Sequence, residues 1–242
     1  QTNPNALYRL MRSLAGEGIF KESKGRVFSN TNLSKGLAEG KSSMKHMIRH
    51  QLNETNWKII GNLGFSISTG RSAAREILGT DTFSHLEKNP DKNELYNKAM
   101  TNTSALSSAA FLAAYSFKNC KLIVDVGGGE GYLLSIILKR HKQLQGIVFD
   151  LPHVVEAANE NSKKIGLEDR AQAVAGDFFS MVPTGGDVYI MKNIVHAFDD
   201  KICKRLLENV AGVMESGSRL LIMETVIEEN NQPAYGKLFD LQ

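Results

Sequence analysis

The chain has 242 residues, of which 42% are hydrophobic and 23% charged, and a formal net charge of +3 at pH 7. These proportions are typical of a globular protein with one large core or two smaller ones, and they argue against intrinsic disorder. The basic residues are spread along the chain, so charge gives no case for nucleic acid as the main partner. The longest apolar runs are far shorter than the roughly 20 residues of a membrane span, so no membrane partner is expected.

Cysteine usage favours a reduced environment. Cys120 and Cys203 form no CxxC pair and have no His/Cys cluster beside them. We therefore expect neither a disulfide scaffold nor a metal site, and the expected localisation is cytoplasmic. Because the chain starts with Gln1 instead of Met, residues upstream are expected to be missing.

The N-terminal region predicts a helix followed by a small hairpin. Apolar residues at near-helical spacing predict a helix over residues 6–20, punctuated by glycines near its end. Two short β-capable segments, 18–21 and 26–29, flank a Ser-Lys-Gly turn at 23–25. This order is the winged-helix pattern, which serves either as a folding and dimerisation module or as a DNA-binding unit. Without a basic recognition face, the sequence favours the dimerisation module.

Residues 43–117 predict a run of helices with few breaks. Their apolar residues recur at helical spacing, and we predict that they are buried against the hairpin and the region that follows. The predicted buried positions are Trp57, Ile60, Leu63, Leu78, Phe83, Leu86, Leu95, Met100, Leu106, Phe111, Leu112 and Tyr115.

From Lys121 onward, strands alternate with helices. The strand segments are almost continuously apolar, which predicts a parallel sheet covered on both faces, that is, a doubly wound α/β domain. We place a mainly helical domain at residues 1–117 and the α/β domain at residues 118–242. The predicted strands are 121–126, 145–149, 171–175, 186–191 and 218–225, and the predicted helices are 130–141, 152–165 and 199–214.

The stretch DVGGGEG spans the end of the first predicted strand and the glycines after it, as the first strand-to-helix turn of a nucleotide-binding sheet does. Glycine is needed where φ is positive or where the backbone must approach a ligand closely. A dinucleotide fingerprint would need glycine at position 132, which is Tyr132. The spacing of Asp125, Gly127, Gly129 and Gly131 instead resembles motif I of S-adenosylmethionine-dependent methyltransferases. A purely structural tight turn would also account for the glycines alone.

Side chains at the ends of later strands extend this interpretation. Asp150 could accept hydrogen bonds from two ribose hydroxyls, or it could cap the helix that starts at Pro152. Asp177 could accept from an adenine amino group and Phe178 could cover the ring, although a strand-end turn with core aromatics explains them too. His196 lies just past the carboxyl end of the fourth strand, where ligands bind in open α/β sheets, so it is a candidate catalytic residue.

Several motifs together resemble one family. FDLPHVV, AGDFF, KNIVHAFDD and LLIMETVI follow DVGGGEG, and ALYRLMRSLAGEGIF and RVFSNTNLSKGL precede it. The chain is similar over nearly its whole length to the S-adenosylmethionine-dependent small-molecule O-methyltransferases, which include the plant caffeate and flavonoid enzymes and bacterial polyketide-tailoring enzymes. The resemblance implies a Rossmann-like methyltransferase domain preceded by a winged-helix dimerisation domain. It also implies a homodimer formed through the N-terminal domain.

The resemblance implies roles for individual residues. His196 is the expected general base, and Glu224 matches the acid that orients it. The plant pattern has Asp directly after this His, whereas this chain has Ala197; we expect catalysis to survive because Glu224 carries the orienting role. The cofactor is S-adenosyl-L-methionine, which leaves as S-adenosyl-L-homocysteine, and no metal is needed. The expected cofactor contacts are Asp125, Gly127, Gly129, Gly131, Asp150, Leu151, Asp177, Phe178 and Lys192.

The expected methyl acceptor is a hydroxyl group of a small aromatic or polyketide-like molecule. Its pocket is predicted at Met100, Asn102, Thr103 and Leu106, which could equally be ordinary core residues. Two alternatives stay open: an N- or C-methyltransferase with the same cofactor site, and a catalytically inactive, cofactor-binding regulator or scaffold. Because the family's sheet has more strands than this sequence shows, C-terminal strands are expected to be missing after YGKLFDLQ.

Overall fold

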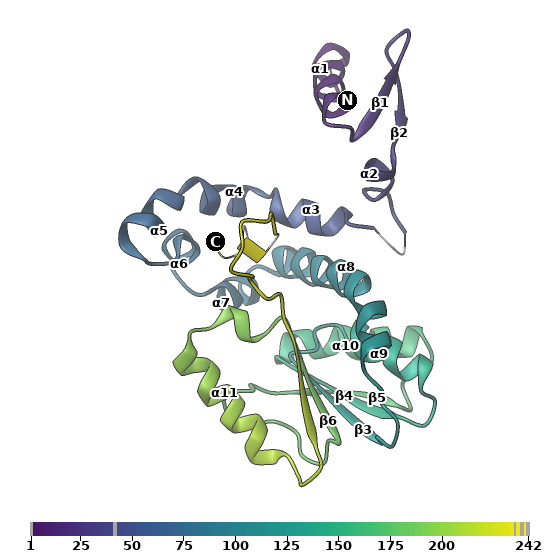
Figure 1. Ribbon diagram of the computed structural model, residues 1–242, viewed down its shortest axis with the longest axis vertical. Helices are drawn as coiled ribbons and strands as arrows, with labels where there is room; N and C mark the ends of the chain where they lie inside the picture. Colours follow the sequence, from purple (N-terminus) through teal and green to yellow (C-terminus); the bar gives the residue numbers. More distant parts are fainter. Residues whose placement is uncertain (1, 41–42, 235, 238–239, 241–242) are drawn as a thin grey trace.

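The computed structural model describes residues 2–40, 43–234, 236–237 and 240. A small N-terminal unit, a run of helices and a parallel sheet follow one another along the chain. The small unit stands away from the rest of the molecule, and the long helix α8 (Pro90–Ala114) lies between α3 (Lys45–Gln51) and the sheet (Figure 1). The chain after the last strand runs back toward the helices, past the end of the sheet (Figure 1).

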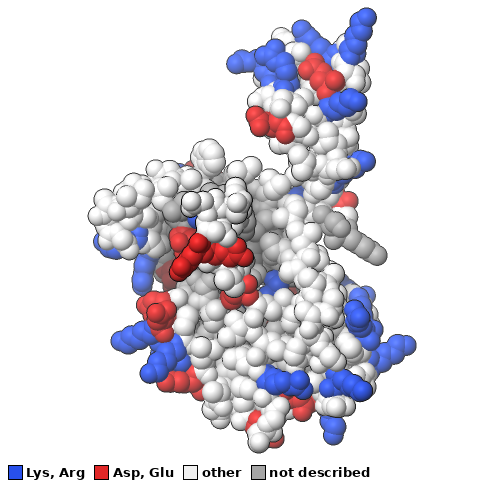
Figure 2. Space-filling model, in the orientation of Figure 1, with Lys and Arg blue, Asp and Glu red and all other residues white. Residues whose placement is uncertain are grey.

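The N-terminal unit has the predicted order of helix and hairpin. Asn3 starts the first helix, because its side-chain oxygen accepts from the backbone amides of Asn5 and Ala6. Figure 2 shows Lys and Arg side chains on several sides of this unit, with Asp and Glu between them, so this view has no single basic face. The elements are α1 (Pro4–Gly16), β1 (Phe20–Ser23), β2 (Val27–Asn30), which pairs antiparallel with β1, and α2 (Asn32–Lys35).

The predicted run of helices is present, but part of its predicted core is wrong. Leu86 is buried, whereas Trp57 is 65% exposed and Leu106 is 55% exposed, and Ile60 and Phe83 are also exposed. Helical spacing identifies an apolar face, but it does not show which other element covers that face. The helices of this run before α8, called the helical arm below, form a single layer beside α8 (Figure 1). No helix in the described ranges is both long enough and apolar enough to cross a bilayer. The arm consists of α3 (Lys45–Gln51), α4 (Glu54–Gly61), α5 (Leu63–Thr69), α6 (Ala73–Leu78) and α7 (Thr82–Glu87).

The sheet has five parallel strands in the order β5-β4-β3-β6-β7. The strand order reverses at β3, because β4 lies on one side of β3 and β6 lies on the other. In folds of this kind, ligands bind at such a reversal, in the crevice formed by the carboxyl ends of β3, β4 and β6. The strands are β3 (Leu122–Val126), β4 (Gln145–Asp150), β5 (Ala171–Ala175), β6 (Val188–Lys192) and β7 (Arg219–Met223), and the helices are α9 (Tyr132–Arg140), α10 (Pro152–Lys164), the short 3₁₀ helix η1 (Val195–Ala197) and α11 (Asp200–Val213).

Two apolar clusters cover the two faces of the sheet. Neighbouring residues of β3 point to opposite faces, so Ile123 packs in the cluster that contains Leu134 of α9, and Val124 packs in the cluster that contains Leu206 of α11. All four of these side chains are fully buried. With both faces covered, a polar ligand reaches this sheet at its edges, and the functional side chains gather at the carboxyl edge.

Candidate active site

The turn between β3 and α9 consists mainly of glycines, and two of them pack closely against neighbouring side chains. Gly127, Gly129 and Gly131 have φ angles of 70°, 58° and 76°, a region that side-chain-bearing residues rarely adopt. A Cβ atom at Gly127 would collide with the side chain of Ile194, and one at Gly131 would lie 3.0 Å from Val148. At Gly129 no described atom lies within 4 Å of such a Cβ position, so the turn is open there, whereas Gly127 and Gly131 pack against the chain after β6 and against β4.

Asp150 joins the end of β4 to the glycine turn. Its Oδ2 accepts from the amide of Gly129 at 2.8 Å, and its Oδ1 accepts from the amide of Leu151 at 2.7 Å. Burial raises the pKa of the Asp150 carboxyl, while the two backbone N–H groups act in the opposite direction. Leu151, not Asp150, occupies the N-cap position of α10 and makes no side-chain cap bond. The interpretation of Asp150 as a helix cap is wrong.

Asp125 and Lys192 lie near the carboxyl ends of β3 and β6, close enough for each to affect the pKa of the other. Asp125 is only 2% exposed, and among the described residues its Oδ2 has no hydrogen-bond partner. Burial raises the pKa of Asp125 to about 7, against the opposing effect of Lys192. Burial also lowers the pKa of Lys192, which ends β6. A buried carboxylate oxygen without a donor is costly, so this position favours a ligand that supplies one.

Asp177 and Phe178 lie in the turn after β5. The carboxylate of Asp177 accepts from the amide of Phe179 at 2.9 Å and is otherwise at the surface. The ring of Phe178 packs edge-on against Phe198, with ring centroids 6.1 Å apart, and lies beside Gly127. The turn therefore places an aromatic ring beside Gly127, and it leaves the carboxylate of Asp177 at the surface.

The predicted acceptor residues lie on α8, and the side chains of two of them form hydrogen bonds with the backbone. The side-chain oxygen of Asn102 accepts from the amide of His46 at 3.1 Å, which ties α8 to the start of α3. The hydroxyl of Thr103 donates to the carbonyl of Met100 at 2.8 Å within the helix. Met100 is half-buried and Leu106 is exposed. Asn102 thus holds two elements of the helical region together.

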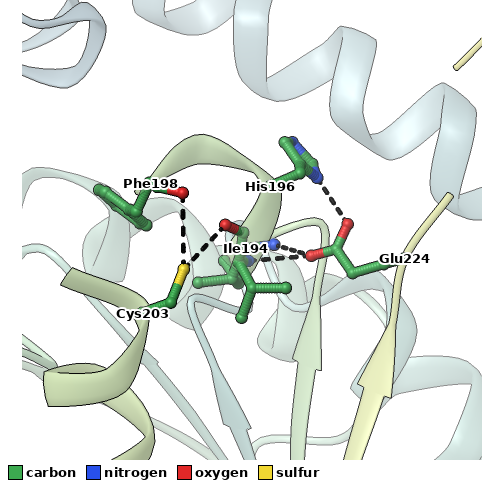
Figure 3. Close-up of polar contacts among 6 residues, drawn as sticks. Ile194, His196, Phe198, Cys203 and Glu224 are labelled. Carbon is green, nitrogen blue, oxygen red and sulfur yellow. Dashed lines mark hydrogen bonds and ion pairs between the residues drawn. The ribbon is translucent and has the colours of Figure 1, made fainter. Parts of the chain in front are cut away.

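His196 and Glu224 meet at the same edge of the sheet. His196 lies on η1, just after β6, and its Nδ1 is 2.6 Å from Oε2 of Glu224, which directly follows β7 (Figure 3). The two residues are 28 positions apart in sequence, and the register that pairs Lys192 with Met223 brings them together. The other carboxylate oxygen, Oε1, accepts from the amides of Ile194 at 2.8 Å and Val195 at 2.9 Å.

The contact with Glu224 selects one form of the imidazole. An ionised carboxylate can only accept hydrogen bonds, so Nδ1 of His196 must carry a proton. In the neutral ring, the lone pair then belongs to Nε2, which is the basic nitrogen of this tautomer. Glu224 is 14% exposed and His196 is 36% exposed, so the carboxylate is shielded while the ring reaches the crevice.

Two side chains near this site were not predicted. The hydroxyl of Ser104 on α8 accepts from the Nζ of Lys192 at 3.0 Å, which connects the helical region to the crevice. Its spacing of one helical turn from Met100 was an available signal. The thiol of Cys203 contacts the carbonyls that flank His196 (Figure 3). No spacing rule in the sequence indicated that contact.

Comparison with known proteins gives the family. The profile of the O-methyltransferase domain matches residues 60–241. The chain belongs to the O-methyltransferase family. The predicted resemblance and the predicted enzyme class are therefore confirmed.

Known relatives and solved structures agree on the fold. This O-methyltransferase is 35% identical over 237 residues to the phenazine O-methyltransferase PhzM of Lysobacter antibioticus, a match that covers 97% of this chain and 69% of the relative. It superposes on the crystal structure of LaPhzM with a TM-score of 0.92 at 34% identity, covering 99% of this chain and 72% of that one. NcsB1 from neocarzinostatin biosynthesis, solved with S-adenosyl-L-homocysteine and 1,4-dihydroxy-2-naphthoic acid, gives a TM-score of 0.82 at 28% identity and coverages of 99% and 73%. The predicted Rossmann-like fold and methyl donor are confirmed for the family.

Proposed function

We propose that this protein transfers the methyl group of S-adenosylmethionine to a hydroxyl of a small aromatic or polyketide-like molecule, with His196 as the general base. The observation that carries the proposal is the contact of 2.6 Å between Nδ1 of His196 and Glu224 at the carboxyl edge of the sheet. The acceptor class is supported by the relative named for phenazine O-methylation and by the naphthoic acid bound to NcsB1.

The residues around the glycine turn suit this cofactor. The carboxylate of Asp150 already accepts from two backbone amides, and its remaining lone pairs are available to ribose hydroxyls. Oδ2 of Asp125, which has no hydrogen-bond partner within the described part of the chain, would accept from a cationic amine, and Lys192 would bind a carboxylate. Phe178 offers an aromatic face for adenine beside the bare backbone of Gly127. These residues are proposed as the cofactor site together with Gly129, Gly131, Leu151 and Asp177.

The mechanism assigns one task to each member of the His–Glu pair. When bound, S-adenosylmethionine supplies a methyl group that its positively charged sulfur already activates. The protein must then align the acceptor oxygen and remove its proton. His196 takes that proton on Nε2, while Glu224 holds Nδ1–H and stabilises the imidazolium that forms. General-base catalysis of this kind typically contributes about 10²–10⁴-fold.

The test is the variant His196→Ala, with His141→Ala as the matched control. His141 directly follows α9 at the opposite edge of the sheet, where its ring packs on Phe117. We expect kcat for His196→Ala to fall by about 10²–10⁴-fold, with the cofactor Kd from calorimetry unchanged, and we expect normal kcat for the control. Near-normal turnover by His196→Ala would remove the base assignment. If a labelled methyl group from the cofactor were transferred only to amine or carbon acceptors, the proposed hydroxyl acceptor would be wrong.

We also propose that residues 1–117 form a homodimer and that residues 118–242 form the catalytic domain. Support comes from large apolar side chains on the N-terminal unit, where Leu10 is 55% and Leu33 is 63% exposed. Light scattering should give twice the chain mass of 26.7 kDa. Leu10→Glu combined with Leu33→Glu should give monomers, whereas the control Ile165→Glu, at an exposed position of the α/β domain, should not. A wild-type monomer would contradict the proposal.

A further inference from the structure

The turn that carries His196 is held to β7 on one side. Asn193 starts the turn in the left-handed region with a φ of 56°, and its amide donates to the carbonyl of Met223 at 3.0 Å. The next two amides, of Ile194 and Val195, both donate to one oxygen of Glu224. Glu224 therefore holds the imidazole of His196 and also the backbone on the N-terminal side of His196.

The other side of the turn faces the thiol of Cys203, which lies in the first turn of α11 (Figure 3). Its Sγ is 3.2 Å from the carbonyl oxygen of Val195 and 3.6 Å from that of Phe198, and it donates to them. A thiol has one proton, so the shorter contact, to Val195, is the main one. Burial, with the nearby carboxylates, raises the pKa of Cys203, which keeps that proton in place.

The thiol is itself held at a defined position. Asp199 caps α11 by accepting from the amide of Ile202 at 2.9 Å, and the amide of Cys203 donates to the carbonyl of Asp199 at 2.8 Å. The carbonyl of Val195 also accepts from the amide of Phe198 at 3.3 Å, which closes the 3₁₀ turn. The carbonyl immediately before His196 thus connects the turn to the fixed start of α11.

We propose that Cys203 is a positioning residue for the catalytic base: its thiol fixes the carbonyl of Val195 and thereby the direction of the His196 side chain. This inference rests on the proposed role of His196. With Glu224 on one side and Cys203 on the other, the turn cannot rotate about its ends, and the ring stays aligned with the acceptor. Misplacement of a reacting group by about 1 Å can cost as much as 10²-fold in rate, so a weak contact has a measurable effect.

The experiment compares three replacements of Cys203 in the intact chain. Ala removes the donor and the sulfur, Val fills the space without a donor, and Ser keeps a donor. For Cys203→Ala and Cys203→Val we expect kcat to fall by roughly three- to tenfold, the effect of losing one neutral hydrogen bond. The acceptor KM and the cofactor Kd should stay unchanged, and Cys203→Ser should recover most of the lost kcat.

Cys120→Ala is the matched control, because it also removes a thiol, but at a position that does not contact the turn carrying His196. Cys120 is 3% exposed in the apolar cluster beside β3, away from the turn. Its kcat per folded molecule should equal that of the wild type. Wild-type kcat in Cys203→Val, or a Ser variant as slow as Val, would overturn the positioning role, and either result holds even if Cys203→Ala fails to fold. Normal turnover by His196→Ala would instead overturn the proposed function.

Discussion

Replacing Glu224 with Gln keeps the shape of the side chain and changes one oxygen into an NH₂ group. The carboxylate accepts hydrogen bonds from the amides of Ile194 and Val195 and from Nδ1 of His196. In the variant, the amide oxygen can keep both backbone donors, which turns the NH₂ group toward Nδ1. Two N–H groups cannot face each other, so the imidazole proton moves to Nε2. His196 then has no free electron pair on the side that faces the acceptor.

The expected magnitudes separate catalysis from stability. Loss of the base should lower kcat for Glu224→Gln by about 10²–10⁴-fold. The free energy of unfolding should fall by only about 1 kcal/mol, because the backbone donors keep an acceptor. Glu224→Ala leaves the amides of Ile194 and Val195 without an acceptor in a largely buried position, at about 1–3 kcal/mol each. It should therefore lose about 2–6 kcal/mol of stability as well as activity.

The assay measures kcat with a labelled methyl donor, the free energy of unfolding in urea, and the imidazole tautomer by nitrogen NMR. Wild-type enzyme should show the proton on Nδ1 and Glu224→Gln should show it on Nε2. Wild-type kcat in Glu224→Gln would refute the tautomer reasoning. A Gln variant as unstable as Ala would show that the amide oxygen does not hold the turn.

Two further predictions concern the carboxylates of the crevice. Asp150→Ala should weaken cofactor binding by about 10- to 100-fold, as loss of a charge-assisted hydrogen bond does, and an unchanged Kd in calorimetry would contradict the ribose role. Burial raises the pKa of Asp125 from 3.8 to about 7, so its contribution to stability is complete below the unfolded value and is lost as the pH rises through about 7. Asp125→Asn lacks this loss, so its stability relative to the wild type should grow between about pH 4 and pH 7, by no more than about 4 kcal/mol. If the difference in unfolding free energy between Asp125→Asn and the wild type, measured in urea, stayed constant across that pH range, the pKa of Asp125 would not be raised.

By itself the sequence determined the order of helices and strands in the α/β region and the place of the glycine turn. These features depend on local patterns, because apolar runs, their period and the need for glycine at positive φ act within a few residues. The predicted strand 171–175 agrees with β5 at both ends. The candidates at strand ends could be named because the carboxyl ends of parallel strands meet at one edge.

Only the tertiary structure decided which side chains touch and which are covered. The contact of His196 with Glu224 depends on the register of β6 and β7, and the bond from Gly129 to Asp150 depends on β4 lying beside β3. The exposure of Trp57 depends on which elements cover the helical arm, and a periodic pattern carries no such information. Both contacts join residues far apart in sequence, and the exposure of Trp57 depends on distant elements, so these features exist only once the chain has folded.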